Sequence, residues 1–261
     1  MKKVTCREEQ ERILLHLKKH LTECIYLTID LEIYGYTHPE VEFWYDEKEG
    51  EVETVLMKYY DSFQIFSANE NWDASKSAEF MKSYMVKTIC GKESMIIKLA
   101  ELMPEYKVQY GIVVKEDSFK EFKQFELVRS AVPEDAREIA ELLLTDEDFG
   151  TNYSLDGLEK QLSDRMKEKK GRSFVMVEDH KIVAHTAIYA ECEDVAVESG
   201  LIVHEDYQKK FYGMIIHEFI KKKLLTEGKT LYGFRIVDNM QRYAKAVGMN
   251  VCGHYGKMTR E

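Results

Sequence analysis

Hydrophobic positions near the start of the chain repeat with a helical period. Ile13, Leu17 and Leu21 recur at helical spacing with charged residues between them, which predicts a helix over residues 7–23. Farther on, two runs at residues 41–46 and 52–60 alternate around a polar turn, which predicts a β-hairpin. The other elements predicted in this half are strands at residues 24–31, 62–67 and 106–115, and helices at residues 72–86 and 92–103.

The second half of the chain has clearer signals for the ends of its elements. Pro133 begins a helix whose first turn holds Glu134 and Asp135, where the positive end of the helix dipole favours acids. Gly171 and Gly228 each follow a helical run, and glycine suits the left-handed conformation that ends a helix. The predicted elements are strands at residues 127–129, 173–177, 182–190, 195–203, 230–235 and 249–258, and helices at residues 133–144, 155–170, 214–227 and 239–247.

A polar and charged stretch at residues 116–126 separates the two halves. It contains three phenylalanines and is not a flexible Gly/Ser linker. We place a domain junction here, which gives an N-terminal α+β domain at residues 1–125 and a C-terminal domain at residues 126–261.

Composition and charge narrow the class of protein. The chain has 261 residues, 44% of them hydrophobic and 32% charged, which is typical of a soluble globular protein. The formal net charge of −10 argues against nucleic acid as a partner, because binding phosphates requires a basic face. No window of about 18 apolar residues is present, and no apolar segment follows the first lysines, so we expect neither a membrane anchor nor a signal peptide.

Neither the cysteines nor the histidines form a recognisable disulfide or metal motif. There are five cysteines, and none belongs to a CxxC pair, which favours reduced thiols in the cytoplasm over a disulfide framework or a zinc site. His16 and His20 lie four residues apart on the first predicted helix, a spacing that can bind a metal. No third ligand lies nearby in the sequence, so we interpret the pair as a solvated helix face and expect no metal.

The stretch at residues 195–227 is the most informative part of the sequence. An apolar strand leads into the polar loop QKKFYG (208–213), and a helix with one apolar side follows. The first turn of a helix has unpaired N–H donors and the positive end of the dipole, so a loop in this position is suited to hold an anion. We interpret the loop as the holder of the pyrophosphate of an acyl-coenzyme A.

Three local patterns together identify a family. The segment VRSAVPEDAREIAELL (128–143) joins a strand to a helix, the loop QKKFYG (208–213) follows an apolar strand, and Asn239 precedes YAKAVGM (243–249). In these patterns and in the order of its elements, the chain from about residue 126 resembles the GNAT superfamily of acyl-CoA-dependent N-acetyltransferases. The resemblance implies an α+β fold with a mixed, mostly antiparallel sheet flanked by helices.

Two positions depart from the family's pattern. Phe211 stands where the phosphate loop of the family has its first glycine, whereas Gly213 matches. Ala244 stands where the family often has a general-acid tyrosine, and Tyr243 is one position away. Residues 1–125 carry no phosphate loop, but their order of elements suits a degenerate GNAT-like half that has lost its cofactor site, which gives a two-domain, tandem arrangement.

The resemblance implies that acetyl-CoA lies, as a co-substrate, against the strand at residues 195–203. Backbone N–H groups of residues 209–214 would hold the pyrophosphate, and one backbone amide of the strand would polarise the thioester carbonyl. Lys209 and Lys210 would add charge, although surface solvation explains these lysines equally well. The expected cofactor-binding residues are Leu201, Val203, Gln208, Lys209, Lys210, Phe211, Tyr212, Gly213, Met214 and Asn239.

Three residues are candidates for the proton transfers. Glu198 interrupts an apolar strand, where a charge is costly without a purpose, and a carboxylate on this strand is the usual acceptor of the amine proton. The alternative is that Glu198 points to solvent. His204 is a second candidate base, and Tyr243 is a candidate acid for the leaving thiolate, although it is equally consistent with packing. We expect His185 to be part of the core or of a pocket wall.

Two functions are consistent with these features. The first is an N-acetyltransferase that moves acetyl from acetyl-CoA to a primary amine of a small molecule or peptide by direct nucleophilic attack, without a covalent cysteine intermediate. The second is a catalytically decayed acyl-CoA-binding or regulatory protein. Phe211 in the phosphate loop and the shifted tyrosine favour this alternative.

Overall fold

The computed structural model describes residues 1–236 and 250–260, and the chain forms two compact units. Unit 1 comprises Met1–Val114 with Phe234–Glu261, and unit 2 comprises Lys115–Gly233. This division groups the end of the chain, which the sequence analysis assigned to the domain at residues 126–261, with the N-terminal residues. The predicted domain boundaries stay a prediction.

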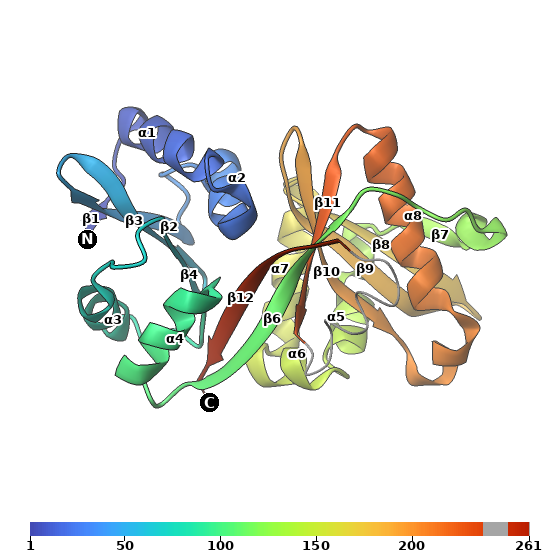
Figure 1. The fold of residues 1–261 in the computed structure, drawn as a ribbon. Coiled ribbons are helices and arrows are strands. Elements are labelled where there is room, and N and C mark those ends of the chain that lie inside the picture. The colour runs from blue at the N-terminus through green and yellow to red at the C-terminus, as the bar shows by residue number, and fades with distance from the viewer. Residues whose placement is uncertain (237–249, 261) are drawn as a thin grey trace. The chain divides into compact units, whose positions relative to one another are not determined.

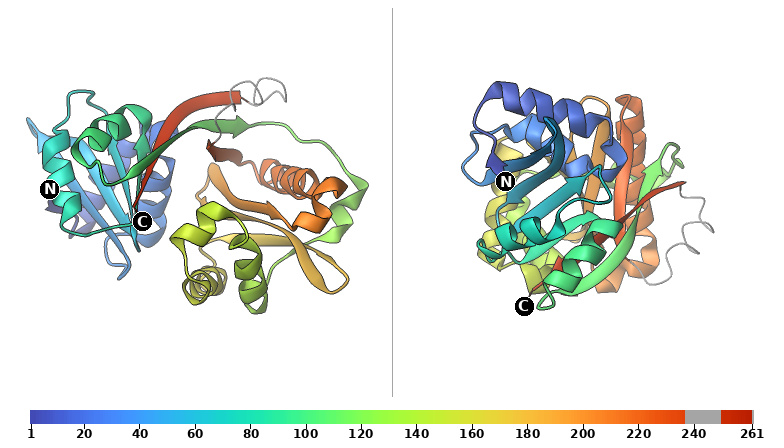
Figure 2. Two further views of the ribbon diagram at one scale, coloured as in Figure 1. Left: turned by 90° about the horizontal axis from the view of Figure 1, so that it is seen from below. Right: turned by 60° about the vertical axis from the view of Figure 1, so that its left-hand side comes forward.

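Unit 1 contains a mixed sheet with helices on both faces (Figure 2). In space its strands follow the order β1-β2-β3-β4-β5-β12-β6. Strands β2, β3 and β4 form an antiparallel meander, and β4 pairs with β5 in parallel. Its elements are β1 (Lys2–Lys3), α1 (Arg7–Lys18), η1 (Leu21–Glu23), α2 (Ile25–Tyr34), β2 (Val41–Lys48), β3 (Glu51–Tyr59), β4 (Ser62–Ser67), α3 (Ala74–Lys82), β5 (Thr88–Lys92), α4 (Glu93–Leu102), β6 (Lys107–Glu116, whose last two residues belong to unit 2) and β12 (Asn250–Thr259).

Alternation along the strands of unit 1 separates its core into two clusters. Trp44 and Leu56 pack with α3 and α4 on one face, whereas Phe43 and Val55 pack with α1 and α2 on the other. Successive residues of a strand point to opposite faces, so each face gets its own apolar layer. The hairpin predicted from this alternation is confirmed, with a turn at Glu49 and Gly50.

The predicted strand at residues 24–31 is wrong, because these residues form most of α2. Leu27, Ile29 and Leu31 are all almost fully buried, and even Asp30 is only 6% exposed. A helix buried along its length has no polar side, so its sequence shows the same continuous apolar run as a buried strand.

The sequence analysis also missed the short strand β5 and the short helix α6.

Unit 2 places α8 on one face of its sheet and α5 and α7 on the other (Figure 1). Its strands follow the order β11-β10-β9-β8-β7. The predicted strands and helices of this half are confirmed within a few residues up to β11. Its elements are η2 (Lys123–Leu127), β7 (Val128–Ser130), η3 (Pro133–Asp135), α5 (Ala136–Leu143), α6 (Glu147–Asn152), α7 (Leu155–Lys167), β8 (Arg172–Glu178), β9 (Lys181–Glu191), β10 (Val195–Val203), η4 (Glu205–Lys210), α8 (Tyr212–Thr226) and β11 (Thr230–Ile236, of which residues 230–233 belong to unit 2).

A bidentate ion pair fixes the start of the helical segment after β7. Arg129 donates from both terminal nitrogens to the two carboxylate oxygens of Asp135, at 2.7 and 2.9 Å. Asp135 also accepts the backbone N–H of Val132 at 2.8 Å. These bonds lower the pKa of Asp135, the ion pair with Arg129 being the main cause.

Across the described ranges, no helix combines the length and apolar character needed to cross a bilayer.

Candidate functional site

Strand β10 loses one of its two partners halfway along its length. Among the described residues, its parallel ladder with β11 runs from Val195 to Glu198, while its pairing with β9 continues to Val203. The pairing with β9 shifts register between Ser199 and Ile202, and Gly200 has a φ of 68°. Such an irregularity bends a strand and re-aims its backbone groups. The second half of β10 therefore presents an edge to which an extended ligand with amide groups can pair.

The helix that follows begins with an open set of backbone donors. Phe211 adopts the left-handed conformation, φ 61° and ψ 18°, directly before α8. Ile215 donates its N–H to the carbonyl of Phe211 at 3.0 Å, which is the first backbone bond of the helix. The backbone hydrogen bonds among the described residues give no acceptor to the N–H groups of Tyr212, Gly213 and Met214. Three adjacent donors at the positive end of a helix form a site for an anion.

Phe211 has a left-handed backbone conformation that glycine adopts more readily than residues with a side chain. The left-handed region costs a residue with a side chain about 1–2 kcal/mol, and glycine almost nothing. The Phe211 ring is 68% exposed, so little packing offsets this cost. At Gly213, a Cβ atom would lie 3.2 Å from Cγ2 of Val203, which leaves little room for a side chain.

Lys210 and Tyr212 are both bound to a carboxylate of the β8–β9 turn. Lys210 Nζ lies 2.6 Å from Glu178 Oε1, and the Tyr212 hydroxyl donates to Oε2 of the same residue. Lys210 also lies over the ring of Tyr207, 4.7 Å from its centroid. The hydrogen bonds from Lys210 and Tyr212 lower the pKa of Glu178. Lys210, one of the two lysines expected to add charge at the phosphate loop, is therefore paired with the carboxylate of Glu178.

Glu198 is buried and held by hydrogen bonds, so it does not point to solvent. Its side chain has no exposed surface. Its Oε1 atom accepts a hydrogen bond from Thr186 Oγ1 at 3.0 Å and lies 2.9 Å from His217 Nδ1. Thr186 is on the neighbouring strand β9, and His217 is on the second turn of α8.

Sequence reasoning missed four other residues of this buried polar cluster, which we define as Glu116, Glu198, His217, Glu218 and Lys221. His217 Nε2 lies 3.8 Å from Glu116 Oε1, and Lys221 Nζ lies 3.2 Å from Glu116 Oε2 and 3.0 Å from Glu218 Oε1. Burial alone would raise the pKa of Glu116, but its interactions with His217 and Lys221 outweigh burial and lower it. Lys221 lies within ion-pair distance of Glu116 and Glu218 and offsets part of the negative charge of the cluster.

A weak signal for α8's part of the cluster is present in the sequence. Lys221 and Leu224 lie four and seven residues after His217 and so share one side of the helix with it, beside the apolar positions that face the sheet. Polar residues in such a border row are usually solvated, so the row alone does not mark a site. Glu116 gave no such signal, because it ends β6 at the start of the polar stretch assigned to the domain junction.

The two other histidines considered lie in different surroundings. His204 is the N-cap residue of η4, where its Nδ1 accepts the N–H of Asp206 at 3.4 Å. His185 is fully buried, and its Nδ1 donates to the carbonyl of Gly200 at 2.8 Å. Burial lowers the pKa of His185 to about 4, so this imidazole is neutral.

The remaining predicted residues fall into three groups. Leu201 and Met214 are unusually exposed for apolar residues, at 40% and 42%. Gln208 and Lys209 lie on η4, at the surface. Asn239 and Tyr243 lie outside the described residues. Within the described ranges, no three His, Cys, Asp or Glu side chains are grouped closely enough to hold a metal ion.

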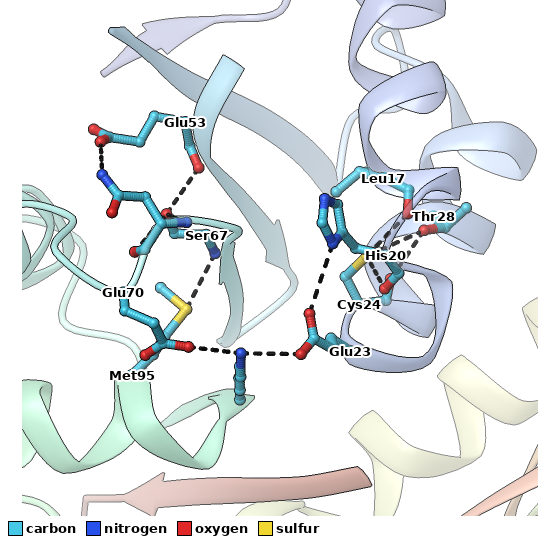
Figure 3. Close-up of polar contacts among 11 residues, drawn as sticks. Leu17, His20, Glu23, Cys24, Thr28, Glu53, Ser67, Glu70 and Met95 are labelled. Carbon is cyan, nitrogen blue, oxygen red and sulfur yellow. Dashed lines mark hydrogen bonds and ion pairs between the residues drawn. The ribbon is translucent and has the colours of Figure 1, made fainter. Parts of the chain in front are cut away.

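Unit 1 contains a parallel strand pair of the same kind, but protein groups fill its open end (Figure 3). The ladder between β4 and β5 ends at Ile65 and Gly91. Beyond it, the backbone amide of Ser67 donates to the sulfur of Met95 at 3.1 Å. At the start of α3, the carboxylate of Asp73 accepts the N–H of Lys76 at 3.0 Å. An acidic cap in this position repels a phosphate.

Comparison with solved structures identifies the fold. A tandem GNAT protein from the clavulanic acid biosynthesis pathway, solved without AcCoA, is 12% identical and superposes with a TM-score of 0.61 over 100% of this chain and 97% of its own. The fold is that of the tandem GNAT proteins. A GCN5-related N-acetyltransferase-like protein from Streptococcus suis gives a TM-score of 0.59 at 14% identity, over 98% of this chain and 100% of its own.

A third structure, of a Drosophila protein, gives a TM-score of 0.67 at 12% identity over 100% of this chain and 98% of its own. No family model and no curated protein matches the sequence. At these identities the likeness establishes the mixed α+β GNAT fold. In this fold β10, η4 and α8 are the strand, loop and helix on which the sequence resemblance placed acyl-CoA.

Proposed function

We propose that the chain is an N-acetyltransferase that moves acetyl from acetyl-CoA to a primary amine. One observation carries this proposal: in the part of the chain that the structure describes, β10 lacks its parallel partner beyond Glu198 and then leads to the open N-terminus of α8. Pantetheine amides would pair with the backbone of Leu201 and Val203. The pyrophosphate would accept the N–H groups of residues 212–214.

The proposed reaction is direct transfer. The neutral amine forms a C–N bond with the thioester carbonyl carbon, the C–S bond breaks, and coenzyme A leaves. A backbone amide near Leu201 would stabilise the developing oxyanion. Before attack the ammonium must lose a proton, and we propose that the Glu198 carboxylate promotes this loss. Because this carboxylate is buried, it acts through a neighbouring group. From the family resemblance, Asn239 is proposed to contact the cofactor and Tyr243 to protonate the leaving thiolate.

The proposed acceptor is a primary amine on a small molecule or a peptide. A net charge of −10 favours a cationic acceptor over an acidic one. The odd number of cysteines without a CxxC motif is consistent with a reducing compartment such as the cytoplasm. The proposed reaction requires no metal, since the thioester is already activated for acyl transfer.

Binding and turnover test this proposal separately. Titration calorimetry is expected to detect acetyl-CoA binding, and a thiol assay to detect CoA release with at least one amine from a panel of polyamines, amino acids, aminoglycosides and peptides. Gly213→Asp is expected to weaken acetyl-CoA binding at least tenfold, because it adds an anion and a side chain where the pyrophosphate would lie. The control Asn71→Asp adds the same charge to an exposed position of unit 1 and is expected to leave affinity unchanged.

The alternative is an acyl-CoA-binding or regulatory protein without catalysis. Two observations favour it: Phe211 holds a glycine conformation in the phosphate loop, and Lys210 is paired with Glu178. Acetyl-CoA binding without CoA release above hydrolysis, for every amine in the panel, would support this alternative. If acetyl-CoA at saturating concentration neither binds nor stabilises the protein, both functions are wrong.

A further inference from the structure

The buried polar cluster arranges His217 between two carboxylates from different strands. Its Nδ1 lies 2.9 Å from Glu198 Oε1, and its Nε2 lies 3.8 Å from Glu116 Oε1. The first distance is a hydrogen bond and requires a proton between the two atoms. The second is longer than a hydrogen bond but short enough for strong attraction between charges. Nδ1 is therefore bound to Glu198, and the nearby carboxylate of Glu116 favours protonation of the ring at Nε2.

Glu116 Oε1 is an unusual atom, because it is buried without a hydrogen-bond partner among the described residues. The whole residue is only 7% exposed, and its other oxygen is paired with Lys221. A buried carboxylate oxygen without a donor is destabilising. A proton on Nε2 of His217 would give this oxygen a cationic partner at 3.8 Å.

Glu198 is the least exposed of the three side chains. The His217 side chain is 12% exposed, compared with 0% for Glu198 and 9% for Glu116. Thr186 is completely buried and does not titrate near neutral pH, whereas His217 combines some exposure with basicity in that range. Glu198 itself cannot meet a substrate without a rearrangement.

We propose that His217 is the base that takes the proton from the acceptor ammonium, directly or through one water, and that Glu198 and Glu116 are positioning residues that orient and charge-stabilise its ring. This inference rests on the proposed acetyl transfer and assigns the residue that performs its proton step. Glu198 holds the tautomer with the proton on Nδ1, as a buried carboxylate does for a catalytic histidine. Glu116 stabilises the imidazolium that forms.

The step balances in protons and bonds. One N–H bond of the ammonium breaks, and its proton joins Nε2 of His217. The neutral amine then forms the C–N bond while the C–S bond breaks, and the second amine proton leaves with the thiol of coenzyme A. With Glu116, Glu198 and Glu218 ionised and Lys221 charged, uptake of the proton changes the formal charge of the cluster from −2 to −1.

Glu198 and Glu116, the two carboxylates that face the His217 ring, belong to unit 2. Glu198 faces it from β10 and Glu116 from β6, while Lys221 and Glu218 lie on its own helix α8. From the segment before β7, the backbone N–H of Lys120 donates to Glu218. The two carboxylates in ion-pair range of the ring both favour its cationic form, whereas Lys221 is compensated by Glu116 and Glu218.

Kinetics of His217→Asn test the assignment. Asparagine keeps an N–H donor for Glu198 but cannot accept a proton at the position of Nε2. We expect kcat/KM for the amine to fall about 100-fold and the KM for acetyl-CoA to stay within about twofold. Wild-type kcat/KM is expected to fall as the pH drops and the imidazole becomes protonated, and this limb of the profile is expected to vanish in the variant.

Two other histidines provide the comparison. His204→Asn removes the competing base candidate, and His180→Asn alters an exposed histidine in the β8–β9 turn, where asparagine tolerates the φ of 64°. The pH limb is expected to persist in both variants. Loss of the limb in His204→Asn, or its persistence in His217→Asn, would overturn the assignment, provided that the wild type turns over.

An NMR titration provides a readout that does not need turnover. The imidazole Cε1–H signal of His217 is assigned by its absence in His217→Asn and followed against pH in the wild type and in Glu116→Gln. Loss of the Glu116 charge is expected to move the midpoint of this titration to lower pH, since it removes an anion that stabilises the imidazolium. An unchanged midpoint would overturn the coupling, whereas absence of turnover with a shifted midpoint would contradict the proposed function instead.

Discussion

The sulfur of Met95 accepts the backbone N–H of Ser67 at 3.1 Å, just beyond the last paired residues of β4 and β5 (Figure 3). In unit 2, the described residues give the corresponding half of β10 no parallel partner after Glu198. The two units thus have related strand pairs, but in unit 1 a side chain from α4 already uses the amide that a ligand would need.

This relationship predicts one acetyl-CoA per chain. In unit 1 the amide of Ser67 is satisfied and Asp73 places an acid at the start of α3, so neither pantetheine nor phosphate has its partners. Titration calorimetry is expected to give a stoichiometry of one, and Gly213→Asp to weaken that one site. A stoichiometry of two, or binding that resists Gly213→Asp but responds to Met95→Trp, would contradict this.

Phe211 provides a test of backbone strain in the phosphate loop. Because it holds a left-handed conformation and its ring is mostly exposed, Phe211→Gly is expected to be about 1 kcal/mol more stable than Phe211→Ala. Chemical denaturation of both variants measures the difference. The matched pair at Lys222, in the middle of α8, is expected to show the opposite order, with alanine more stable by about 1 kcal/mol. Equal stability of the two Phe211 variants would mean that the loop relaxes out of the left-handed region.

Glu178→Gln is expected to tighten acetyl-CoA binding. The substitution removes an anion beside the proposed pyrophosphate site and releases Lys210, which Glu178 now holds at 2.6 Å. The expected gain is a severalfold decrease in the Kd for acetyl-CoA, and this gain is expected to shrink at high salt. Calorimetry at two ionic strengths measures both effects. The control Glu193→Gln removes a charge from another exposed position and is expected to change the Kd for acetyl-CoA little. Weaker binding in Glu178→Gln would contradict the prediction and would assign Glu178 a structural role in the loop.

His185 is expected to make the protein less stable as the pH falls below 6.5. Burial lowers its pKa in the folded state to about 4, from an ordinary value of 6.5. Between these values the unfolded chain binds a proton that the folded chain does not, so stability is lost as the pH decreases through this window. The loss attributable to His185 is about 2 kcal/mol between pH 7.5 and pH 5.

Denaturation of His185→Gln at the same two pH values checks this effect. The variant is expected to lose about 2 kcal/mol less free energy of unfolding than the wild type over this interval. His180→Gln, at an exposed turn, is expected to behave as the wild type. An equal pH dependence in wild type and His185→Gln would show that the ring is solvated in the folded protein.

Periodicity and end signals predicted most elements of the fold. The hairpin of β2 and β3 and the order of elements from β7 to β11 follow from alternation, from Pro133 and from the glycines that end helices. The residues of α2 were assigned to a strand because a fully buried helix has no polar side. The loop at residues 208–213 was identified as the bend between strand and helix, because it interrupts two apolar patterns.

The sequence by itself determined that a charged residue, Glu198, lies in an apolar strand and that a polar loop precedes an amphipathic helix. It did not determine what surrounds Glu198. His217 and Glu116 lie 19 and 82 residues from Glu198 along the chain, and only the tertiary structure places both carboxylates within 4 Å of the His217 ring. The hydrophobic periodicity of a segment indicates which face of a helix or strand is apolar. The partner of a buried charge depends on contacts between distant elements, which the tertiary structure alone decides.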